Sequence, residues 1–65
     1  MNIMELLKEQ EASIDFDDRW LYWETDSEKW VVRERKQFQR FSKVICRTTD
    51  EEIAVKFLRE REGIE

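Results

Sequence analysis

The chain has 65 residues, a net charge of −4, one cysteine and no histidine. This length favours one domain with a small core, and we expect residues 1–65 to form a single small α+β domain. One cysteine excludes an internal disulfide bond, and the lack of histidine disfavours a structural zinc site, so we expect no metal and no cofactor. Three Trp, four Phe and one Tyr instead indicate dense aromatic packing or self-association as the source of burial.

The first predicted element is a helix over residues 3–12. Asn2 is suited to cap its N-terminus, and Glu5 follows at the spacing of a capping box. The apolar residues that follow the spacing of one helical face are Ile3, Leu6 and Leu7. Such a short helix is marginal alone and has to pack on the rest of the domain.

Three strands are predicted after an irregular connector. Residues 13–18, SIDFDD, are rich in Ser and Asp, which bond nearby backbone groups and compete with regular structure, so we expect a connector there. Runs of aromatic and β-branched residues predict the strands, with turns at 26–28 and near 37–39. The predicted strands cover residues 19–25, 29–36 and 39–47.

A C-terminal helix is predicted from about residue 50 to residue 62. Thr49 is placed to cap it, with Glu52 at the third position of a capping box, and Gly63 suits the position after its end. The resulting order is α-β-β-β-α. We therefore expect a three-stranded antiparallel meander sheet packed by a C-terminal helix, with a short N-terminal helix.

Charge is segregated along the chain. The net charge is −7 over residues 1–28, +6 over residues 29–47 and −3 over residues 48–65. The basic middle segment predicts a local site for an anionic partner, whereas the acidic total disfavours a purely electrostatic grip on nucleic acid.

Alternation along the strands predicts two different sheet faces. The residues expected beneath the C-terminal helix are Trp30, Val32, Val44 and Cys46. The opposite face then mixes basic, aromatic and aliphatic groups, and either the first helix or a partner is expected to cover it. We assign to it Val31, Arg33, Arg35, Phe41, Lys43, Ile45 and Arg47, with Leu21 and Trp23 as further candidates.

The candidate partner-binding residues are Trp23, Val31, Arg33, Arg35, Arg40, Phe41, Lys43 and Arg47. Three interpretations stay open. The Arg and Lys stems cover apolar sheet and pair with the acidic flanks, or they contact a protein or a second copy of the chain. In the third interpretation, the Arg and Lys side chains contact nucleic acid phosphates while an aromatic side chain stacks on a base.

No pattern predicts catalysis. Asp15, Asp17 and Asp18 lack the further oxygen ligands and the glycine turn of a calcium loop. No nucleophile or metal set accompanies the carboxylates of the strands, and Cys46 has no histidine to lower its pKa. We therefore expect no catalytic residue, no small-molecule substrate and no enzyme.

The chain is expected to be cytoplasmic. Its N-terminus, MNIMELLKEQEAS, lacks the basic start and apolar run of a signal peptide, and no stretch is long enough to span a membrane. A lone cysteine suits a reducing compartment. We accordingly expect no membrane partner.

The strands and final helix resemble the AP2-like N-terminal DNA-binding domains of phage and transposon integrases. The segments that carry the resemblance are residues 30–33 (WVVR), 43–48 (KVICRT) and 52–58 (EIAVKFL), within residues 19–62. The resemblance implies that the sheet enters the major groove of DNA. The residues that it implicates are Arg33, Arg35, Arg40 and Lys43. The chain departs from the family by lacking a glycine turn between these strands and by starting its last helix with acidic residues.

The function expected from the sequence is that of a small interaction module, a regulator of the kind that phages and other mobile elements encode. It would dock on a protein partner or on a second copy through the basic and aromatic sheet face. The alternative is a DNA-binding module that uses the same three strands.

Overall fold

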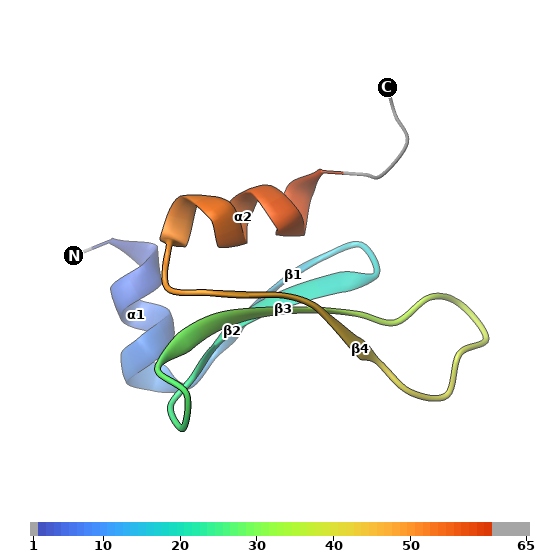
Figure 1. The fold of residues 1–65 in the computed structure, drawn as a ribbon, viewed down its shortest axis with the longest axis horizontal. Coiled ribbons are helices and arrows are strands. Elements are labelled where there is room, and N and C mark those ends of the chain that lie inside the picture. Colours follow the sequence, from blue (N-terminus) through green and yellow to red (C-terminus); the bar gives the residue numbers. More distant parts are fainter. Residues whose placement is uncertain (1, 61–65) are drawn as a thin grey trace.

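The computed structural model describes residues 2–60, which form a four-stranded antiparallel sheet and two helices (Figure 1). The α+β class is confirmed, but the prediction of three strands is wrong, because the chain has the order α-β-β-β-β-α. The elements are α1 Ile3–Gln10, β1 Ser13–Phe16, β2 Arg19–Glu24, β3 Lys29–Glu34, β4 Lys43–Thr48 and α2 Glu51–Arg59. The strands follow one another across the sheet in chain order, so β1 and β4 are its edges.

Strand β1 is the segment that was predicted to be a connector. Ile14 and Phe16 alternate with Ser13 and Asp15, and all four pair with β2. A two-residue turn joins the strands, and Asp17 takes φ 64 there, in the left-handed region that Asp tolerates better than most residues. The Ser and Asp residues that suggested a connector are therefore the outer positions and the turn of a hairpin.

Helix α1 begins as predicted and ends earlier. The side chain of Asn2 accepts a hydrogen bond of 2.9 Å from the backbone N–H of Glu5. Glu11 takes φ 52, and its N–H donates to the carbonyl of Leu7, which ends the helix at Gln10 instead of residue 12.

Helix α2 is capped by Asp50, so the prediction of Thr49 as the N-cap is wrong. The Asp50 carboxylate accepts hydrogen bonds from the backbone N–H groups of the second and third helical residues. The helix ends at Arg59, three residues before the predicted end, because Glu60 is extended. Gly63 lies outside the described residues.

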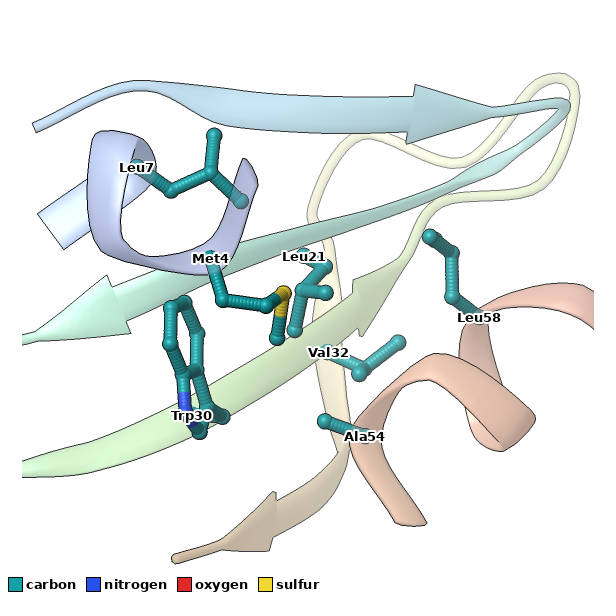
Figure 2. Close-up of a cluster of buried hydrophobic side chains, with 7 residues drawn as sticks. All are labelled: Met4, Leu7, Leu21, Trp30, Val32, Ala54 and Leu58. Carbon is teal, nitrogen blue, oxygen red and sulfur yellow. The ribbon is translucent and has the colours of Figure 1, made fainter. Parts of the chain in front are cut away.

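The hydrophobic core lies between the two helices and one face of the sheet. Figure 2 shows side chains from α1 and α2 converging on those of β2 and β3. The core residues are Met4, Leu7, Leu21, Trp30, Val32, Ala54 and Leu58. Both helices therefore cover the same face.

Two residues suggested for the opposite face belong to this core side. Leu21 is completely buried in the core. Trp23 packs edge-on against Trp30 with 5.0 Å between the ring centroids, and Nζ of Lys8 lies 4.2 Å from the Trp23 ring centroid. Placing Leu21 and Trp23 on the opposite face is wrong, because they pair with Val32 and Trp30 across β2 and β3.

A bulge in β4 changes which side chains share a face. Val32 pairs with Cys46 and Arg33 pairs with Val44, so Ile45 is an extra residue between these pairs. Ile45 and Cys46 consequently both pack against the core, while Val44 lies beside Arg33 on the other face. The predictions for Val44 and Ile45 are wrong because strict alternation fails at the bulge.

Candidate interaction surface

The open face is the sheet surface turned away from both helices. Its central residues are Trp20, Tyr22, Glu24, Val31, Arg33, Val44 and Arg47. No described element covers this face, since α1 packs on the other side of the sheet through Met4 and Leu7. The alternative in which the first helix covers it is therefore wrong.

The arginines of the open face are bonded to their neighbours. Nε of Arg33 donates to the Tyr22 hydroxyl at 3.0 Å, and its Nη1 donates to the Ser42 hydroxyl at 3.0 Å. Nε of Arg47 lies 3.2 Å from Oε1 of Glu24. Both guanidinium groups thus have partners within the domain.

The Glu24 carboxylate is the centre of a small polar cluster. Hydrogen bonds from Ser27 and Arg47 hold the pKa of Glu24 below its ordinary value of 4.5. The same hydrogen bond and the nearby negative charge raise the pKa of Arg47. The charges of this part of the open face largely cancel.

Val31 is 0% exposed although neither α1 nor α2 lies over it. Its cross-strand neighbours are Tyr22 and Arg47, whose long side chains flank it on the same face. Burial beside the stem of an arginine and a tyrosine ring is how an uncovered sheet keeps an apolar residue dry. The interpretation in which arginine stems cover the apolar sheet and pair with acidic residues therefore fits Val31 and Arg47.

The connection between β3 and β4 is different. This β3–β4 loop, residues 35–42 (RKQFQRFS), extends beyond the ends of the strands (Figure 1). Phe38 is 94% exposed and Phe41 is 81% exposed. Arg35, Lys36 and Arg40 are exposed as well, and none of them pairs with a carboxylate within residues 2–60. The prediction of a strand from residue 39 is wrong, since β4 begins at residue 43.

Hydrogen bonds fix the ends and the tip of the β3–β4 loop. The N–H of Arg35 donates to the carbonyl of Asp18 at 2.9 Å, and the Arg33–Ser42 bond holds the other end. At the tip, the N–H of Gln39 donates to the carbonyl of Lys36 at 3.1 Å. The loop therefore presents its side chains from a defined backbone.

Phe38 occupies the third position of this turn with φ 73. Glycine or asparagine usually takes that position, because a positive φ brings Cβ of other residues close to the backbone. A bulky residue there costs on the order of 1–3 kcal/mol, and such strain clusters at functional sites. The backbone conformation that exposes Phe38 is therefore strained, and this strain lowers the stability of the fold.

The eight predicted site residues do not share one surface. Val31, Arg33 and Arg47 lie on the open face, and Arg35, Arg40 and Phe41 lie in the β3–β4 loop. Trp23 is half-buried on the helix side. Lys43 pairs with Glu34 at the helix side of the sheet, so its assignment to the opposite face is wrong.

Sequence reasoning missed Phe38. The signal was present in the run RKQFQRFS, where two phenylalanines alternate with three cations and no acidic residue occurs. Reading residues 39–47 as a strand concealed it, because that reading left only a tight turn before residue 39.

Three further findings concern metal binding, thiol reactivity and membrane crossing. Among residues 2–60, no three or more His, Cys, Asp or Glu side chains form a group that could hold a metal ion. Burial raises the pKa of the Cys46 thiol. No helix in this part of the chain is long and apolar enough to cross a membrane.

Comparison of the chain with protein-family models, curated proteins and solved structures finds no match. The function proposed below therefore rests on the geometry and chemistry of the described residues. The likeness to integrase domains stays a prediction.

Proposed function

We propose that the chain is a small non-enzymatic interaction module that docks on a protein partner through the β3–β4 loop. The observation that carries the proposal is the near-complete exposure of Phe38 and Phe41 among three cations that pair with no carboxylate of residues 2–60. Aromatic side chains and arginine are the groups that most often dominate protein interfaces. The matching partner surface offers an apolar groove with carboxylates at its rim.

The two phenylalanines contribute to docking, not to the fold. In the isolated chain both side chains lie in water, whereas burying each on a partner would contribute roughly 1.5–3 kcal/mol. The cations around them attract an acidic partner and speed encounter. Because the loop is already held by hydrogen bonds, docking orders fewer groups and costs less entropy.

The open face is secondary in this proposal. Its arginines already bond Tyr22, Ser42 and Glu24, so a partner would have to displace those bonds. The sequence-based proposal of docking through the sheet therefore moves to the adjoining loop.

A selection from a peptide display library tests the proposal. On the immobilised chain we expect enrichment of peptides that combine carboxylates with aliphatic or aromatic residues. The enrichment should disappear on the double variant Phe38→Ser, Phe41→Ser. The matched control is Ile3→Ser, which removes a side chain that is 60% exposed on α1 and should leave the selection unchanged. The same peptides on both variants would refute docking through the loop.

Binding of duplex DNA is the second candidate, and the absence of any described element over the open face favours it. The residue set implied by the integrase resemblance is divided, however, since Lys43 lies on the helix side. Anisotropy titrations of a labelled duplex separate the two functions. DNA binding should weaken by roughly 0.9 log units per phosphate contact per decade of salt, and no binding at low salt would eliminate this candidate.

A further inference from the structure

An open groove of about 660 Å³ runs along α2 on the side that faces β1. Its apolar lining comes from Met4, Phe16 and Val55, and Phe16 is 45% exposed. At the N-terminal end of α2, Glu51 and Glu52 line the same groove. This groove has the composition that the β3–β4 loop requires of a partner.

The acidic end of the groove is electrostatically unmatched within the domain. Glu51 and Glu52 are exposed, and neither forms an ion pair within the part of the chain that the structure describes. The other end of the groove carries Lys56, Arg59 and Glu60. A cationic segment is therefore attracted to the Glu51–Glu52 end and repelled from the other.

We propose that the β3–β4 loop of one copy of the chain docks in the α2 groove of a second copy. This inference rests on the proposed function and names the partner. Phe38 and Phe41 enter the apolar part beside Met4 and Val55, while Arg40 and its neighbouring cations meet Glu51 and Glu52. The charge complementarity is between the one exposed run of cations in residues 35–42 and carboxylates that lack partners among the described residues.

The loop of the same chain does not fill the groove. Its first residue, Arg35, bonds the carbonyl of Asp18 in the β1–β2 turn, but no residue of the loop lines the groove. Phe38 and Phe41 instead lie exposed, at 94% and 81%. The groove is therefore open to a segment from another molecule.

Two other surfaces fit a second copy less well. The groove of about 550 Å³ on the other flank of α2 is lined by Arg19, Lys43 and Lys56 together with Glu34 and Glu60. Because Glu34 pairs with Arg19, the remaining charge is positive and disfavours the cationic loop. The free edge of β4 carries Lys43 and the Ile45 bulge, and both features discourage pairing of edge strands. The loop-and-groove contact is the better match.

This contact is head-to-tail, because the loop and the groove are different patches. After the first contact one copy keeps a free groove and the other a free loop, so the association either closes as a reciprocal two-fold dimer or proceeds to rings or open chains. We expect sedimentation equilibrium to show an average mass that rises with concentration to at least that of a dimer. Added salt should lower it, since the rim contacts are ionic.

Charge exchange between the two patches tests the contact. The first variant, Arg40→Glu with Lys36→Glu, has an acidic loop; the second, Glu51→Lys with Glu52→Lys, has a basic groove end. We expect each variant alone to associate at least about tenfold more weakly than the unmodified chain, because like charges now meet. An equimolar mixture should recover association, since each loop then finds a groove of opposite charge.

The control for charge reversal is Glu9→Lys on the exposed side of α1, which should not change association. Circular dichroism checks that every variant keeps its helices. A chain that stays monomeric at millimolar concentration, or a mixture that associates no better than its components, would overturn the inference. The chain could be monomeric while the peptide enrichment still disappears on the Phe38→Ser, Phe41→Ser variant. In that case docking through the loop stands, and only the identification of the partner as a second copy is refuted.

Discussion

Arg19 and Glu34 face each other across β2 and β3, with Nε of Arg19 3.0 Å from Oε2 of Glu34. Glu34 is only 4% exposed. The guanidinium of Arg19 also donates to the carbonyls of Phe57 and Glu60 at the C-terminal end of α2, where helical carbonyls lack partners. One arginine thus ties the buried carboxylate of the sheet to the end of the helix.

Removing the Arg19 side chain should destabilise the domain strongly. Arg19→Met leaves Glu34 as a buried charge without its partner, and breaking one side of a buried pair costs about 3–5 kcal/mol. A domain of this length has a total stability of roughly 3–10 kcal/mol, so the variant should be close to unfolding. Urea denaturation followed by Trp fluorescence measures the change. The control Arg40→Met should stay within about 0.5 kcal/mol of the unmodified chain, and an equally small effect of Arg19→Met would contradict the assignment.

Glycine at position 38 should stabilise the fold. Phe38→Gly relieves the positive φ, and although glycine loses more backbone entropy on folding, the net gain should reach up to about 1 kcal/mol. Phe41 is not among the residues with positive φ, so Phe41→Gly should give no gain. Thermal unfolding of both variants decides the matter, and destabilisation by Phe38→Gly would show that Phe38 packs within the fold.

The Glu24–Arg47 pair should make stability depend on pH. Because the pKa of Glu24 is lower in the folded chain than its ordinary 4.5, the pair stabilises the fold above that pH, and this contribution is lost as pH falls through the lowered pKa. Glu24→Gln should therefore weaken the fold at pH 7 and make no difference at pH 2. Urea denaturation at both pH values checks this. A loss of stability that is equal at the two pH values would contradict an ionic role.

The Cys46 thiol should react slowly with disulfide reagents. Burial raises its pKa and keeps the less reactive protonated form at neutral pH. We expect its reaction with Ellman's reagent at pH 8 to be several-fold slower than in urea, where the chain is unfolded. Equal rates in both conditions would show that Cys46 is not held against the core.

The sequence predicted both helices and strands β2 and β3 close to their observed positions, because these elements have clear periodic patterns. The start of β4 was predicted at residue 39 instead of residue 43. Asn2 caps α1 as predicted, since its side chain needs only a local partner. Strand β1 was missed because Ser13 and Asp15 are poor strand formers by propensity. Pairing with β2 overrides that propensity. This pairing depends on tertiary contacts, so it cannot be seen in the segment alone.

The faces of β4 could not be predicted from alternation. The extra residue Ile45 shifts the register by one position, which moves Val44 to the open face and leaves Lys43 on the helix side. No glycine or proline marks this bulge or the turn at Phe38. The boundaries of the β3–β4 loop, and with them the exposure of Phe38, depend on this pairing.

The most direct test of docking between loop and groove is a concentration series of ¹⁵N–¹H NMR spectra. As the protein concentration rises, we predict shifts in two separate regions, the β3–β4 loop at residues 35–42 and the groove around Phe16, Glu51 and Glu52. Both sets should move with one apparent affinity and return when salt is added. Shifts confined to β4, or a spectrum that does not change with concentration, would contradict the account.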